Sequence, residues 1–64
     1  MAKAELTRQL DEEIERIATS LAYWRSQAQL QADSPLVATV TDIADRFALQ
    51  LQQLEEARDV LRDA

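Results

Sequence analysis

The residues of this chain that could do chemistry are carboxylates, a few hydroxyl groups and arginines. Asp11, Glu12, Glu13 and Glu15 form the densest acidic cluster, and the chain has no histidine and no cysteine. On a helix these carboxylates fan around the axis, and they lack the Glu-x-x-His spacing of di-metal helical bundles. We therefore interpret them as a solvated acidic surface and expect neither a metal site nor a cofactor.

Covalent catalysis has few groups to use. The hydroxyls of Ser20, Ser26, Ser34 and Tyr23 show no recognisable arrangement of nucleophile and base. The sequence contains no glycine, so a phosphate-cradling loop of the usual kind is not expected. We predict that the chain is not an enzyme and has no small-molecule substrate.

Helices must hold these residues, because the apolar side chains recur with a helical period. The spacing alternates between four and three residues, which is the a/d seam of a helix packed on a neighbour. The seam residues of the first half are Leu10, Ile14, Ile17, Leu21, Trp24 and Ala28; those of the second half are Val37, Val40, Ala44, Phe47, Leu51 and Leu54, followed by Arg58 and Leu61.

A single break separates the two halves. We predict a helix over about residues 3–31, a turn over about 32–34 and a second helix over about 35–62. Ser34 or Asp33 can cap the second helix, and Pro35 suits its first position. Because the connection is short, the helices must be antiparallel. The predicted fold class is all-α: one helical coiled-coil hairpin over residues 1–64.

The predicted packing surface is wider than a hairpin can cover by itself. A chain of 64 residues without cysteine has few other means of stabilisation. Leu6, Leu36 and Ile43 flank the seam, so we expect two hairpins to form a four-helix bundle around a two-fold axis, with a higher oligomer or a different protein as alternatives. The expected core and dimer residues are Leu10, Ile14, Ile17, Leu21, Val40, Ile43, Phe47, Leu51, Leu54 and Leu61.

One polar residue interrupts the seam. Arg58 faces the level of Leu10, and we expect its stem to be buried and its head to reach water. A glutamate of the first helix, such as Glu13, is expected to neutralise it.

Aromatic residues suggest a binding patch near the turn. Tyr23 and Leu30 are one heptad apart on a face away from the seam, and Tyr23, Trp24 and Arg25 are consecutive residues of the types enriched in interface hot spots. We predict that Tyr23, Trp24, Arg25 and Leu30 bind a partner. Alternatively, Trp24 is only a core residue, Tyr23 covers its rim and Arg25 is solvated. Leu49 and Val60 also lie off the seam, either in the dimer surface or as ordinary exposed residues.

The charge balance narrows the class of partner. Seven basic against twelve acidic residues leave a formal charge of −5, which opposes binding to phosphate backbones and favours a basic protein. No run is long and apolar enough for a membrane span, and no signal peptide is recognisable, so we expect a cytoplasmic protein that does not bind membranes.

The chain's length and heptad organisation resemble those of the small plasmid copy-number proteins of the Rop type, which are dimers of helical hairpins that bind paired RNA loops. This resemblance implies RNA binding. Such binding needs a basic face, whereas Arg8, Arg16 and Arg25 are outnumbered by neighbouring carboxylates. We therefore expect no nucleic-acid partner.

Together these features favour a small non-enzymatic protein–protein interaction module. The leading hypothesis is a bacterial or bacteriophage regulatory protein that binds and inhibits a larger host protein with a basic surface, such as a transcription regulator. The alternative is a structural oligomerisation or chaperone-like subunit, which would use the seam without needing an exposed aromatic patch.

Overall fold

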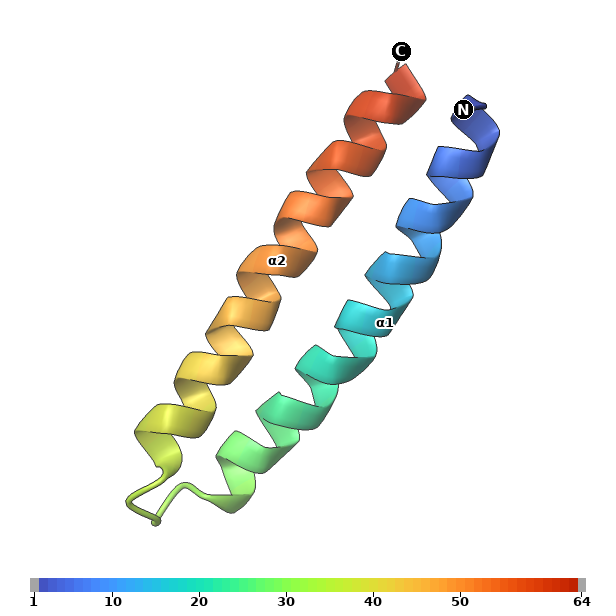
Figure 1. The fold of residues 1–64 in the computed structure, drawn as a ribbon. Coiled ribbons are helices and arrows are strands. Elements are labelled where there is room, and N and C mark those ends of the chain that lie inside the picture. The colour runs from blue at the N-terminus through green and yellow to red at the C-terminus, as the bar shows by residue number, and fades with distance from the viewer. Residues whose placement is uncertain (1, 64) are drawn as a thin grey trace.

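Two long helices and one short connection make up the fold. The computed structural model describes residues 2–63, with α1 over Lys3–Leu30 and α2 over Val37–Asp63. The helices run side by side in opposite directions, and the first and last described residues lie at the same end (Figure 1). The rod measures 48 × 15 × 14 Å. The predicted all-α two-helix hairpin is confirmed for the described residues.

The helices are supported along their exposed surfaces by pairs of side chains one turn apart. Glu5 lies in the first turn of α1, where the positive end of the helix dipole stabilises a negative charge. Arg8 bridges Glu5 and Glu12, and Arg46 pairs with Asp42 at 3.0 Å. Such exposed pairs each contribute about 0.3 to 0.5 kcal/mol, so they favour helix formation without determining the fold.

Helix α2 begins later than the sequence pattern predicts, because the connection includes a separate turn. The Ser34 hydroxyl accepts a hydrogen bond from the Leu36 N–H at 3.1 Å, and the Ser34 carbonyl accepts one from Val37 at 3.1 Å. These bonds span two and three residues, so they close a turn tighter than an α-helix. The regular four-residue pattern begins with the bond from the Val40 N–H to the Leu36 carbonyl.

The predicted boundaries are corrected accordingly. Helix α2 begins at Val37 and not at Pro35, and it continues to Asp63; α1 ends at Leu30, one residue earlier than predicted. The Ser34 hydroxyl accepts a hydrogen bond from the N–H of Leu36, which precedes α2, so it closes the turn before the helix. The delay arises because the Ser34 bonds fold residues 34–36 into a separate turn.

Few side chains are fully enclosed. Ile17, Leu21 and Ala44 are the buried core of the described residues, with exposed fractions of 1%, 5% and 6%. The other eight of the ten predicted packing residues, including Phe47 and Leu51, are only half-buried. Ala44 lies on the predicted seam, although it was not in the predicted packing set. The hairpin therefore leaves much of its seam partly open.

No helix within residues 2–63 combines the length and apolarity that crossing a bilayer requires.

We predict that Ile17→Ala lowers the free energy of unfolding by about 2 to 4 kcal/mol, because it leaves a cavity at the most enclosed position. Chemical denaturation monitored by circular dichroism measures this change. The matched control is Leu49→Ala, which truncates a side chain that is 57% exposed and should change stability by no more than about 0.5 kcal/mol. Equal effects of the two substitutions would show that the core is placed wrongly.

Candidate protein interface

The hairpin has two broad sides, each made from one flank of both helices. With the seam at positions a and d of each heptad, positions c and g lie next to each other beyond d, and positions b and e beyond a, because successive residues are about 100° apart. In an antiparallel pair the g positions of both helices fall on the same side. We call this the apolar side; it consists of Leu6, Gln9, Glu13, Arg16, Ser20, Tyr23, Gln27, Leu30, Leu36, Thr39, Ile43, Arg46, Gln50, Gln53, Ala57 and Val60.

The opposite side differs in composition. We call it the polar side; it consists of Ala4, Arg8, Asp11, Glu15, Ala18, Ala22, Arg25, Gln29, Ala38, Thr41, Asp45, Ala48, Gln52, Glu55, Asp59 and Arg62. It carries five carboxylates, three arginines and no large apolar side chain. The two sides of the rod are thus distinct surfaces.

Exposed apolar residues are concentrated on the apolar side. Among the described residues, six large hydrophobic side chains are exposed, and five of them belong to this side: Leu6, Tyr23, Leu30, Leu36 and Val60, with exposed fractions from 40% to 73%. The sixth, Leu49, lies on the outer edge of α2. Scattered exposed apolar residues are ordinary, whereas a concentration on one surface marks an interaction site.

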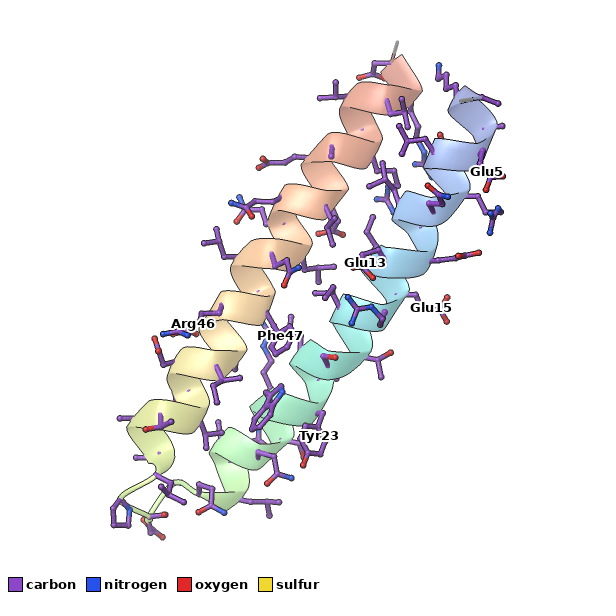
Figure 2. The ribbon with its side chains drawn as sticks, in the orientation of Figure 1. Glu5, Glu13, Glu15, Tyr23, Arg46 and Phe47 are labelled. Carbon is purple, nitrogen blue, oxygen red and sulfur yellow. The ribbon has the colours of Figure 1, made fainter. Side chains whose placement is uncertain are left out.

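The turn half of the apolar side carries an aromatic corner, formed by Tyr23 and Trp24. Their ring centroids are 5.2 Å apart and their planes meet at 84°, an edge-to-face arrangement. Figure 2 shows Tyr23 on the turn half of α1. Trp24 is half-buried at the seam, whereas 56% of Tyr23 is exposed. The exposed Leu30 and Leu36 continue this apolar surface toward the turn.

The open half of the same side carries an apolar groove. It is lined by Leu6, Leu10, Ala57, Val60 and Leu61, which come from both helices. Leu6 was predicted to flank the seam and Val60 to lie off it, but the two were not joined with Ala57 into one feature. Their c and g positions show that these residues lie on the same side of the hairpin. Their grouping into one groove depends on which ends of the two helices lie next to each other.

The apolar side is poor in acidic residues. Glu13 is its one carboxylate, against Arg16 and Arg46, so this side has a formal charge of +1 in a chain of −5. Arg16 donates two hydrogen bonds to Glu13, at 2.5 and 2.6 Å, and this bonding holds the pKa of the Glu13 carboxyl below its usual value. The other eleven carboxylates of the sequence lie elsewhere.

Arg58 is the polar residue in the seam, as predicted, but Glu13 does not neutralise it. The Arg58 Nη1 lies 3.7 Å from an Asp11 carboxylate oxygen, and its Nε lies 3.8 Å from Asp59. The Arg58 side chain is 23% exposed, and its Nε is buried without a hydrogen-bond partner among the described residues. The prediction was wrong because Glu13 projects to the apolar side, where Arg16 holds it, whereas Asp11 belongs to the polar side.

Three of the four predicted anchor residues come together. Tyr23, Trp24 and Leu30 lie on or beside the apolar side. Arg25 follows Trp24 in sequence, but it is about 200° around the helix from Tyr23 and belongs to the polar side. Arg25 therefore does not share a surface with Tyr23 and Leu30, and partner binding by the four residues stays a prediction.

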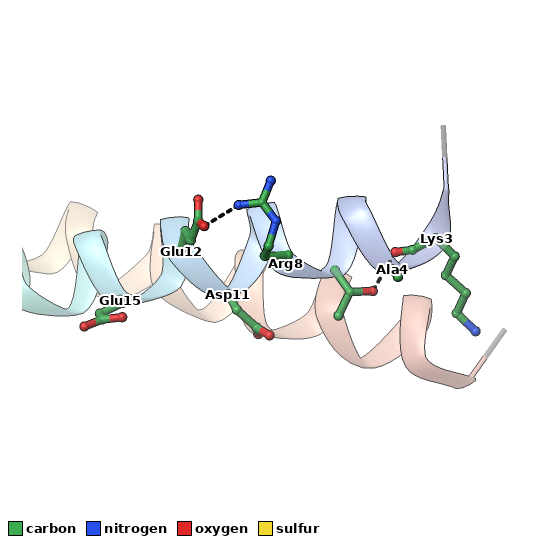
Figure 3. A pocket seen from close by; sticks show the side chains of 7 residues that line it. Lys3, Ala4, Arg8, Asp11, Glu12 and Glu15 are labelled. Atoms are coloured by element: carbon green, nitrogen blue, oxygen red, sulfur yellow. Dashed lines mark hydrogen bonds and ion pairs between the residues drawn. The ribbon is translucent and has the colours of Figure 1, made fainter.

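The predicted acidic cluster is also divided. Figure 3 shows a surface hollow on α1 lined by Asp11, Glu12 and Glu15, in which Glu12 pairs with Arg8. Asp11 pairs with Arg58 of α2, and Glu13 lies on the apolar side. No set of three or more residues within 2–63 is arranged to hold a metal ion.

We predict that Arg58→Leu leaves the unfolding free energy unchanged or raises it by about 1 to 3 kcal/mol, because leucine removes a buried Nε that has no partner and the released Asp11 is exposed to water. Thermal unfolding at fixed protein concentration measures the effect. Arg62→Leu, at an exposed position one turn further on, is the matched control and should have little effect. A clear loss of stability in Arg58→Leu alone would show that the ion pair stabilises the fold.

A scan against protein-family models finds no matching family, and searches of the curated proteins and of the solved structures find no significant match either. The assignment of a function therefore depends on the residues and geometry of the apolar and polar sides.

Proposed function

We propose that this chain is a non-enzymatic protein–protein interaction module that works by having its apolar side covered by another protein. The supporting observation is that five of the six exposed large apolar residues of the described chain lie on that one side. Removing the exposed part of these five side chains from water favours association through the hydrophobic effect.

A second copy of the chain is the partner that we propose first. Two hairpins that meet through their apolar sides make a four-helix bundle, in which the half-buried seam residues at the d positions gain neighbours from the other copy. A two-fold axis lets one surface serve both copies, and it is the commonest symmetry of soluble oligomers. The half-buried state of Phe47 and Leu54, both at d positions beside the apolar side, supports this proposal.

In such a dimer the carboxylates remain outside. Eleven of the twelve acidic residues lie off the apolar side, so the assembled surface is strongly acidic. We propose that this surface binds a larger protein with a basic surface, such as a transcription regulator, and that the chain is a regulatory or inhibitory protein of bacterial or bacteriophage type. The alternative is a structural oligomerisation or chaperone-like subunit, in which the carboxylates only keep the assembly soluble.

The dimer is tested by a matched pair of charge substitutions. Tyr23→Glu places a carboxylate on the apolar side, whereas Leu49→Glu places one at an equally exposed position, 57% against 56%, on the outer edge. We expect wild type and Leu49→Glu to have a light-scattering mass of twice the 7.3 kDa chain, and Tyr23→Glu to approach the mass of one chain. A wild-type monomer at all concentrations, or equal effects of both substitutions, would contradict the proposed dimer.

The regulatory role is tested by neutralising the polar side. We expect the triple variant Glu15→Gln, Asp45→Asn and Glu55→Gln to keep the dimer mass and to lose salt-sensitive binding to basic proteins of the source cell. Binding to the immobilised variant and wild type is compared at low and high ionic strength, because interactions of exposed charges weaken with salt. If the wild type retains no protein that the variant fails to retain, the structural alternative is favoured.

A further inference from the structure

We propose that two copies of the chain associate in an antiparallel orientation, apolar side against apolar side, with the aromatic corner of each copy packed into the apolar groove of the other. This inference rests on the proposed dimer and adds its orientation and its contact residues. It follows from where the aromatic corner and the apolar groove lie along the rod.

The first step is the placement of these features relative to the middle of α1. The midpoint of Lys3–Leu30 lies between residues 16 and 17. At 1.5 Å per residue, Tyr23 lies about 10 Å from this midpoint toward the turn, and Leu10 lies about 10 Å from it toward the open end. A two-fold axis that crosses the rod at its middle exchanges these two levels. Each aromatic corner would then face the groove lined by Leu6, Leu10 and Val60 of the other copy.

Residues of α2 at equal distances from its midpoint also match in size across the proposed axis. The midpoint of Val37–Asp63 is Gln50, and Ile43 and Ala57 are each seven residues from it on the apolar side. The same axis therefore places the large Ile43 of one copy against the small Ala57 of the other, and the two Gln50 amides near the axis. Large residues opposite small ones allow close packing between facing surfaces.

The parallel orientation lacks this fit. A two-fold axis along the rod would bring the two turn halves together, with the exposed Tyr23, Leu30 and Leu36 of both copies at the same end. The two apolar grooves would then face each other at the other end and leave space unfilled between them. Unfilled apolar space forfeits contacts on both surfaces, so the antiparallel orientation is favoured.

The charges of the apolar side favour a second copy as the occupant. Two chains of −5 repel each other, and they do so least through the side that has one carboxylate and two arginines. Near the axis, the Glu13–Arg16 pairs of the two copies would form a cluster of two glutamates and two arginines, which is electrically balanced. A strongly basic partner would instead meet the net positive charge of this side.

The orientation is measured with one spin label on each chain. The sequence has no cysteine, so Asp33→Cys in the connection gives a single labelling site at the turn end of the rod. We expect an interspin distance close to the 48 Å length of the rod, because antiparallel copies place their turns at opposite ends. Thr19→Cys, on the outer edge of α1 near its middle, is the control and should give a much shorter distance.

The outcomes separate this inference from the proposed function. A long Asp33 distance supports the antiparallel orientation. A dimeric protein whose Asp33 labels lie within half the rod length overturns the orientation and leaves the dimer intact. A monomer, established by mass, overturns both.

The contact between Ile43 and Ala57 is tested by exchanging their sizes. Ala57→Ile would place a large residue opposite Ile43 at both of the symmetry-related contacts in the antiparallel dimer. We expect the dimer dissociation constant to rise by about tenfold or more. The double variant Ile43→Ala with Ala57→Ile restores a large residue opposite a small one and should recover most of the affinity. The two positions are 14 residues apart on one straight helix and cannot compensate within one chain. Failure of the double variant to recover affinity would overturn the proposed contact.

Discussion

The structure depends on one constraint: two helices cannot enclose an apolar surface that extends beyond the seam between them. In a rod 15 Å by 14 Å across, every residue lies close to solvent, and only side chains that point directly at the neighbouring helix are covered. Ile17, Leu21 and Ala44 meet that condition. The remaining seam residues keep part of their surface exposed, so the stability of the hairpin and its capacity to bind have the same physical origin.

The two sides of the hairpin differ in charge, and this difference determines which side of the incomplete core can be covered by a partner. Large apolar residues accumulate on the c and g positions of both helices, and carboxylates accumulate on the remaining exposed positions. Glu13 is the exception, and its hydrogen bonds to Arg16 within α1 satisfy it locally. A surface that carries the exposed large apolar residues and a single carboxylate can approach another copy of itself, while the acidic remainder keeps its affinity for water or for a basic protein.

Arg58 is a polar residue in the seam that lowers the stability of the hairpin relative to an apolar residue at this position. It takes a seam position that a leucine would fill, and its guanidinium is held between Asp11 and Asp59 at distances of 3.7 and 3.8 Å, beyond hydrogen-bonding range. An arginine in the seam contributes less to stability than an apolar residue of similar size. A polar seam residue can instead define register, a function known for single polar core residues in coiled coils.

The sequence by itself determined the hairpin, because the alternation of four- and three-residue spacings and the single break near Ser34 specify two antiparallel helices. It also placed Tyr23 and Leu30 on one face, since that relation lies within one helix. The late start of α2 is also local, because it depends on hydrogen bonds of Ser34 that span two and three residues, although the spacing pattern did not predict it. Only the tertiary structure decided the partner of Arg58 and the groove between Leu6 and Val60, because both depend on which residues of two different helices face each other. The sequence placed Arg58 at the level of Leu10 but did not show toward which side of the seam its guanidinium extends, and this is the physical reason why Asp11 was missed.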